Sequence, residues 1–136
     1  MTGTNASGGR VFDASALLAY VFDEPGAAAV RLHLRGGPAA CSAANWSELA
    51  QKVHQKGQDW ALAKGLLAPR LTIEPVTAAD AEAAALLWRD HPQLSLGDRL
   101  CLALASRLGW PALTADAAWL ACEGTELIRP APDSRR

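Results

Sequence analysis

The stretch LSLGDRLCLALASRLGWPALTADAAW, residues 94–119, predicts a helix that is followed directly by a short buried strand. Ser95 is a typical N-cap, and the apolar residues that follow it at helical spacing would bury most of the helix surface. Gly109 and Pro111 are typical of a helix end, and residues 112–114 form an apolar run of strand length. The stretch is therefore one helix–strand unit of an α/β sheet.

Two carboxylates enclose this helix–strand unit. Asp98 lies in the first turn of the predicted helix, and Asp116 follows the predicted strand. In a parallel α/β arrangement, helix N-termini and strand C-termini lie at the same edge of the sheet, so the two carboxylates converge although a whole helix separates them in the sequence. Because open α/β sheets bind ligands at that edge, we expect a functional site there.

The rest of the chain alternates short apolar runs with helical segments. Strands are predicted at residues 10–12, 39–41, 71–73, 112–114 and 126–128, and helices begin near residues 15, 27, 43, 59, 78 and 96. Asp13 directly follows the first strand, and Glu48 lies one and a half turns into the helix after the second strand. The alternation indicates a three-layer α/β domain with a mainly parallel five-stranded sheet.

Length and composition indicate one cytoplasmic domain. The chain has 136 residues, of which 50% are hydrophobic, enough to bury a core without a metal or disulfide staple. We expect the domain to span residues 10–129, with disordered tails at residues 1–9 and 130–136. The three cysteines lack CxxC spacing, which suits a reducing compartment. No leader pattern opens the chain, and no apolar run approaches the roughly 18 residues of a membrane span.

The charge balance by itself argues against a nucleic-acid partner. The formal net charge is −1, from 13 basic and 14 acidic side chains. If four of the acids hold a metal ion, however, the remaining side chains carry a net charge of +3. A polyanion could bind where that positive charge gathers, so the net charge neither supports nor excludes a nucleic-acid partner.

Four acidic residues are expected at one edge of the sheet: Asp13, Glu48, Asp98 and Asp116. Clustered carboxylates repel one another unless protons or a cation intervene. Mg²⁺, with Mn²⁺ as the alternative, is the natural occupant, because hard cations prefer carboxylate oxygens and keep coordination sites for water and a substrate phosphate. Such a site can activate water and stabilise charge on a phosphorus centre, with one metal ion or with two.

Each of these acids also has a purely structural interpretation. Asp13 and Asp116 could cap the turns that follow them, and Asp98 could be the acid of a capping box. Glu48 could pair with Lys52 one turn later. Caps explain why an acid is tolerated at each position, but they do not explain why one edge of the sheet has so many. Taken together, the four acids favour a functional site.

Other chemical motifs are absent from the sequence. The three histidines, His33, His54 and His91, have neither metal-ligand spacing nor an identifiable nucleophile partner. The sequence contains no GxxxxGK[ST] and no GxGxxG motif, so it does not support a nucleotide-binding loop.

Three segments resemble a known family. They are VFDASALLAYVFDEPG at residues 11–26, SAANWSELAQKV at residues 42–53, and the opening stretch at residues 94–119. They are similar, in order and spacing, to the three signature segments of PIN-domain ribonucleases, especially the VapC toxins of bacterial toxin–antitoxin pairs. One departure is Gly97, which precedes Asp98 where alanine or another small residue is common. The glycine could loosen the start of that helix without moving the acid.

The resemblance implies a fold, a site and partners. The family's four acids fall on Asp13, Glu48, Asp98 and Asp116, and the hydroxyls of Ser15 and Thr114 match positions that support the acids. The implied sheet order is 3-2-1-4-5. The implied activity is magnesium-dependent RNA cleavage by a homodimer, with inhibition by a small antitoxin. The helices at residues 15–22 and 27–34 carry surplus apolar side chains that could form a groove for an antitoxin segment.

We therefore expect an endoribonuclease in which Asp13, Asp98 and Asp116 hold the metal, while Glu48 holds a metal-bound water or acts as the base. An aspartyl-nucleophile phosphatase is the nearest alternative, but it normally requires D-x-D, and residue 15 is serine. A phosphoacceptor domain would need an adjacent acid pair after the first strand and a late lysine. A non-catalytic PIN-like binding partner is the third alternative, and the four intact acids argue against it.

Overall fold

The computed structural model describes residues 8–130, so the predicted tail residues 1–7 and 131–136 lie outside the described part. The strands are β1 (Arg10–Phe12), β2 (Ala39–Ser42), β3 (Thr72–Glu74), β4 (Ala112–Thr114) and β5 (Thr125–Leu127). All four neighbouring pairs are parallel, and the strand order is β3-β2-β1-β4-β5. The predicted sheet and its order are thereby confirmed, with β3 and β5 displaced by one residue from their predicted positions.

In the described part of the chain, six α-helices connect the strands, and most begin at a side-chain cap. They are α1 (Ala14–Val21), α2 (Ala27–Gly36), α3 (Ala43–Gln55), α4 (Trp60–Leu67), α5 (Ala78–Leu87) and α6 (Leu96–Leu108), with short 3₁₀ turns η1 (Ala68–Arg70) and η2 (Ala117–Ala121). Thr77 with Asp80, and Ser95 with Asp98, form reciprocal capping boxes at the starts of α5 and α6. The backbone N–H groups of residues 88–90 bond three residues back, so α5 ends in a tightened turn ahead of His91 and Pro92.

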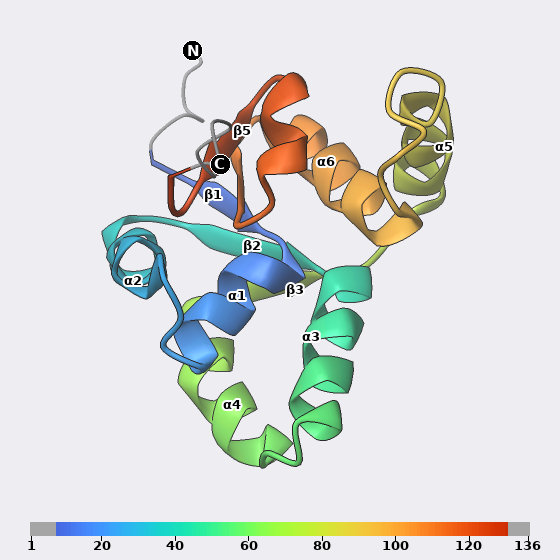
Figure 1. Ribbon diagram of the computed structural model, residues 1–136. Helices are drawn as coiled ribbons and strands as arrows, with labels where there is room; N and C mark the ends of the chain where they lie inside the picture. The colour runs from blue at the N-terminus through green and yellow to red at the C-terminus, as the bar shows by residue number, and fades with distance from the viewer. Residues whose placement is uncertain (1–7, 131–136) are drawn as a thin grey trace, which may run out of the picture.

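Hydrophobic residues cover both faces of the sheet, as a parallel sheet requires. Successive strand residues point to opposite faces, and Val11 and Phe12 accordingly belong to two different core clusters. Phe12 packs with α1, α3 and α4 on one side, whereas Val11 packs with α6 on the other side, where α5 also lies (Figure 1). Within residues 8–130, no helix is both long and apolar enough to cross a membrane.

The carboxyl ends of β1 and β4 meet next to the start of α1. Phe12 pairs with Leu113 across the two strands, and the Asp13 N–H donates to the Leu113 carbonyl at 3.1 Å. Asp13 is the N-cap of α1 and Asp116 the N-cap of η2, so each strand delivers an acid at the same edge. This edge is the one that the sequence predicts for the site.

Candidate functional site

Asp13 is a buried carboxylate that accepts hydrogen bonds from three donor groups, one of which, the Ser15 hydroxyl, is shared between its two oxygens. The side chain is 4% exposed. Its Oδ1 atom accepts from the Ala16 N–H at 2.8 Å and from Ser15 Oγ at 2.8 Å. Its Oδ2 atom accepts from Thr114 Oγ1 at 2.6 Å and from Ser15 Oγ at 3.0 Å. These contacts fix the plane and direction of the carboxylate.

The two hydroxyls also join α1 to the end of β4. Ser15 Oγ accepts from the Ala115 N–H at 2.9 Å, and Thr114 Oγ1 accepts from the Asp116 N–H at 3.0 Å. Ser15 and Thr114 are themselves 3.3 Å apart. The positions that the family resemblance assigns to supporting hydroxyls therefore connect Asp13 to the backbone that carries Asp116.

Burial dominates the protonation of Asp13. Desolvation raises the pKa of Asp13 from 3.8 to about 6, against the opposing hydrogen bonds from Thr114, Ala16 and Ser15, and the nearby charge of Asp98 raises the pKa further. Keeping this carboxylate ionised at neutral pH therefore costs free energy in the folded protein. A cation beside the carboxylate would lower that cost, because a positive charge stabilises the ionised form.

This pKa shift predicts that the metal-free protein loses stability as the pH rises. Between pH 3.8 and about 6, the folded state keeps the Asp13 proton that the unfolded chain releases. The contribution of this proton to the free energy of unfolding is therefore complete below pH 3.8 and lost above about pH 6. The loss corresponds to about 3 kcal/mol. Urea unfolding of wild type and Asp13→Asn in a chelator, from pH 4 to 8, should show the variant gaining this amount relative to wild type. A difference that does not vary with pH would contradict the prediction.

Asp98 and Asp116 each cap a helical turn with one carboxylate oxygen. Asp98 Oδ2 accepts from the Ser95 N–H at 3.2 Å, and Asp116 Oδ1 accepts from the Ala118 N–H at 2.9 Å. Among residues 8–130, no hydrogen bond engages the second oxygen of either carboxylate. The capping interpretation is thus correct for both residues, and it leaves one oxygen of each for a ligand.

Glu48 is held by Asn45 rather than by Lys52. Asn45 Nδ2 donates to Glu48 Oε1 at 2.8 Å and to the Gly97 carbonyl at 3.0 Å, which joins α3 to the start of α6. A Cβ atom at position 97 would lie 2.6 Å from Glu48 Oε2. Gly97 therefore lets the Glu48 carboxylate lie against the start of α6, and an alanine at this position would require that carboxylate to shift.

The four acids line one pocket. Its volume is about 190 Å³, and its lining comprises Asp13, Ala14, Ser15, Leu18, Glu48, Lys52, Asp98 and Asp116. The acids come from the end of β1, the second turn of α3, the first turn of α6 and the residue before η2. The structure thus brings together every acid that the sequence predicts for this edge.

The donor set fits a hard divalent cation, because it consists of carboxylate oxygens. Within the described residues, however, no group of three or more acids, cysteines or histidines is arranged so that it could hold a metal ion as it stands. Ion binding therefore requires the carboxylates to turn toward a common point. Asp98 and Asp116 lie at the starts of helical segments and can turn with one oxygen uncommitted.

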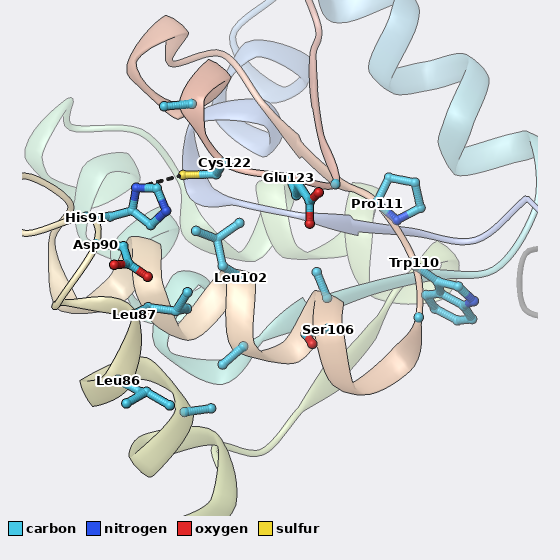
Figure 2. Close-up of a pocket in the computed structure, with 16 residues that line it drawn as sticks. Leu86, Leu87, Asp90, His91, Leu102, Ser106, Trp110, Pro111, Cys122 and Glu123 are labelled. Carbon is cyan, nitrogen blue, oxygen red and sulfur yellow. Dashed lines mark hydrogen bonds between the residues drawn. The ribbon is translucent and has the colours of Figure 1, made fainter.

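A larger pocket lies away from the acids, as Figure 2 shows. It has a volume of about 990 Å³ and lies between α5, α6 and the segment around η2. At its wall, Cys122 Sγ lies 3.6 Å from His91 Nδ1. Burial raises the pKa of the Cys122 thiol, so the pair does not contain a ready thiolate nucleophile. None of the four acids lines this pocket, and it is not the predicted site.

Two residues beside the acids were not predicted from the sequence to belong to the site: Asn45, which contacts Glu48, and Lys52, which lines the pocket. Asn45 is fully buried, and its spacing of three residues from Glu48 on a helix is the signal that could have found it. Lys52 appears in the sequence analysis only as a partner for Glu48, but it lines the pocket and forms no ion pair with Glu48 within 4.0 Å. Both residues lie on α3, whose orientation the sequence does not define.

Residues 10–122 match the model of the PIN domain family, which covers most of the chain. The chain belongs to the PIN domain family. The match confirms the family resemblance of the three sequence segments. No curated protein matches the sequence of this PIN domain.

Solved toxin structures share the fold of this PIN domain. The sarcin-ricin loop cleaving toxin VapC20 of Mycobacterium tuberculosis has a TM-score of 0.72 and 21% identity, covering 89% of this chain and 99% of that chain. A toxin–antitoxin complex from Klebsiella pneumoniae has a TM-score of 0.70 and 19% identity, covering 90% and 99%. DNA-bound VapBC from Salmonella typhimurium has a TM-score of 0.69 and 14% identity, covering 88% and 97%. These likenesses show that the chain has the same fold as the solved VapC-type toxins.

Proposed function

We propose that this PIN domain is a metal-dependent endoribonuclease toxin that hydrolyses RNA phosphodiester bonds and is inhibited by a cognate antitoxin. The observation that carries the proposal is the convergence of Asp13, Glu48, Asp98 and Asp116 on one pocket. These acids come from four separate segments of the chain, so local helix capping cannot account for their meeting. Membership of the PIN family and the fold shared with VapC toxins support the nuclease interpretation.

Asp13, Asp98 and Asp116 are the proposed metal ligands. A bound Mg²⁺ or Mn²⁺ would supply positive charge for the phosphorus centre and would lower the pKa of a water molecule. Asp13 is oriented by Ser15 and Thr114, which keep its carboxylate directed at the pocket. Asp98 and Asp116 keep their capping bonds through one oxygen and present the other.

Glu48 is the proposed general base. Its Oε1 atom is held by Asn45 at 2.8 Å, which limits the rotation of the carboxylate beside the other three acids. In hydrolysis, Glu48 accepts a proton from water as the water oxygen forms a bond to phosphorus. The bond from phosphorus to the leaving ribose oxygen breaks, and that oxygen takes a proton from solvent.

The alternatives explain fewer features of the site. An aspartyl phosphatase places a second acid two residues after the nucleophile, whereas Ser15 occupies that position and donates to Asp13. Hydrogen bonds to both Asp13 oxygens suit a fixed ligand better than an attacking nucleophile. A non-catalytic partner would not need four acids in the lining of one pocket.

Cleavage of RNA by the purified full chain tests the proposed activity. We expect cleavage with Mg²⁺ or Mn²⁺, loss of cleavage in a chelator, and recovery when the cation is returned. Mapping the new RNA ends after induced expression would identify the target and the cleavage position. A pure preparation that leaves total RNA intact under all these conditions would contradict the nuclease proposal.

The proposed protein partners are an antitoxin and a second copy of the chain. Most apolar side chains of α1 and α2 are used by the core, since Leu17, Val30 and Leu34 are buried. Leu32 on α2 and the pair Leu62 and Leu66, one turn apart on α4, remain exposed. These exposed leucines support a partner-binding surface. Fewer apolar side chains of α1 and α2 are exposed than the sequence suggests.

Expression of this chain alone is expected to be poorly tolerated by the host cell, because an open nuclease pocket would degrade RNA. Coexpression with a small protein encoded beside it should restore growth, and that protein should copurify. Sedimentation of the complex would then report whether the chain is a homodimer. If the wild type cleaves RNA yet proves harmless and binds no such neighbour, a housekeeping nuclease should replace the toxin proposal.

A further inference from the structure

The acid pocket has one basic residue in its lining. Lys52 lies on α3, one turn after Glu48, and shares the pocket with the four acids. Asn45, Leu49 and Val53 bury one face of α3, which fixes the helix, and Lys52 lies exposed at the edge of that face. The position of this positive charge at the pocket is therefore a consequence of helix packing.

Lys52 is not neutralised by an ion pair. Among residues 8–130, the ion pairs within 4.0 Å are Arg10 with Glu126 and Arg107 with Asp80. Glu48, which could have paired with Lys52, is instead engaged by Asn45. The ammonium group is thus available to an anion that enters the pocket, and the four acids around it would otherwise repel such an anion.

A second lysine continues the positive charge along α3. Lys56 is the C-cap of α3 and lies one turn beyond Lys52. Its Nζ atom lies 5.2 Å from the centre of the Phe22 ring at the end of α1, in a cation–π contact. α1 and α3 lie on the same side of the sheet (Figure 1). Phe22 follows Leu18, which lines the pocket, by one turn, so the contact places Lys56 one turn beyond the pocket lining.

The spacing of the two lysines suits an extended nucleic-acid strand. Residues four apart on a helix lie about 6 Å apart along its axis. Glu48, Lys52 and Lys56 follow this spacing, so the charge along α3 changes from negative at the site to positive beyond it. Successive phosphates of a single strand could therefore contact Lys52 and Lys56 while the neighbouring phosphodiester lies at the acids.

We propose that Lys52 and Lys56 bind RNA phosphates next to the bond that is cleaved, with Lys52 at the pocket and Lys56 one phosphate further along the strand. The proposal rests on the proposed ribonuclease function, because it assigns the direction in which the substrate leaves the four acids. Both lysines are positioning residues for the substrate, and they take no part in proton transfer.

The test is RNA binding measured separately from cleavage. A labelled single-stranded oligoribonucleotide is titrated with the full chain in a chelator, at several KCl concentrations, using fluorescence anisotropy. Lys52→Ala combined with Lys56→Ala should weaken binding roughly tenfold and reduce the slope of log K against log salt by about 1.4, or about 0.7 for each lost contact. With Mg²⁺ present, the same double variant should show a raised KM and a nearly unchanged kcat.

Two controls separate phosphate binding from general charge or folding effects. Lys64→Ala removes an exposed lysine of α4 that does not line the pocket, and it should bind RNA like wild type. Lys52→Arg combined with Lys56→Arg keeps both charges and should restore affinity and salt dependence.

Three results would overturn the proposal. The first is an alanine double variant with wild-type affinity and salt slope. The second is equal loss of affinity in Lys64→Ala. The third is an alanine double variant that keeps RNA affinity but no longer retains a copurifying protein, which would assign the lysines to that partner. Cleavage of RNA by the wild type tests the nuclease function, whereas the lysine variants test only the phosphate contacts. If the wild type cleaves RNA and the lysine variants bind RNA like wild type, only the proposal about the lysines fails.

Discussion

Asp98→Asn is expected to abolish RNA cleavage while leaving the fold and its stability nearly unchanged. The Asn side chain keeps an oxygen that can accept from the Ser95 N–H, so the capping box at the start of α6 survives. The variant loses only the negative charge that the proposed metal site needs. Because a bound metal supplies several kcal/mol of stabilisation to the reacting phosphate, cleavage should fall by roughly a thousandfold or more.

Ser95→Ala is the matched control for the capping role of Asp98. Ser95 Oγ accepts from the Asp98 N–H at 3.1 Å, so this variant removes a capping bond without touching the carboxylate. It should lower the free energy of unfolding by about 1 kcal/mol and keep cleavage. Cleavage assays and urea unfolding on both variants check the pair. An Asp98→Asn protein that cleaves RNA like wild type would remove Asp98 from the site.

Added Mg²⁺ is expected to raise the melting temperature of the wild type, and Asp13→Asn combined with Asp116→Asn should eliminate that rise. The carboxylates converge only in the folded chain, so an ion that binds them stabilises the fold by mass action. At an Mg²⁺ concentration 100 times the Kd, the gain is about 2.7 kcal/mol. The gain should shrink as the pH falls, because protons then compete for Asp13, whose metal-free pKa is about 6.

A double variant outside the pocket controls for net charge. Asp59→Asn with Glu123→Gln also neutralises two acids, and neither residue lines the acid pocket. The side-chain oxygen of Asn can still accept from the Ala61 N–H, so the cap of α4 is kept. Thermal melts with and without Mg²⁺ should show a wild-type response in this control. An equal Mg²⁺ response in the Asp13 and Asp116 variant would show that the ion binds elsewhere.

The sequence predicted the sheet because its pattern is local. Apolar runs of strand length alternate with capped helical segments, and the parallel order requires the first and fourth strands to deliver Asp13 and Asp116 to one edge. The capping box of Ser95 and Asp98 was likewise predictable, because its two residues lie within one helical turn. The convergence of the acids therefore follows from chain order and known topology.

The internal contacts of the site were not predictable in the same way. Asn45 contacts Gly97 across 52 positions of the chain, and this contact places Glu48 against α6. The sequence suggested Lys52 as the partner of Glu48, because the two lie one turn apart on the helix. Only the packing of α3 against α6 decides which neighbour Glu48 meets, and a helical pattern carries no information about that packing.

By itself, the sequence determined the family, the sheet and the four acids, because these depend on residue types at short spacings. The tertiary structure decided the environment of each acid. Asp13 has a raised pKa since several elements exclude water from it together, while Asp98 and Asp116 each keep an oxygen directed away from their caps. The desolvation of a carboxylate and the direction of its side chain both depend on contacts between segments that are far apart in the sequence. Those contacts exist only after the chain has folded.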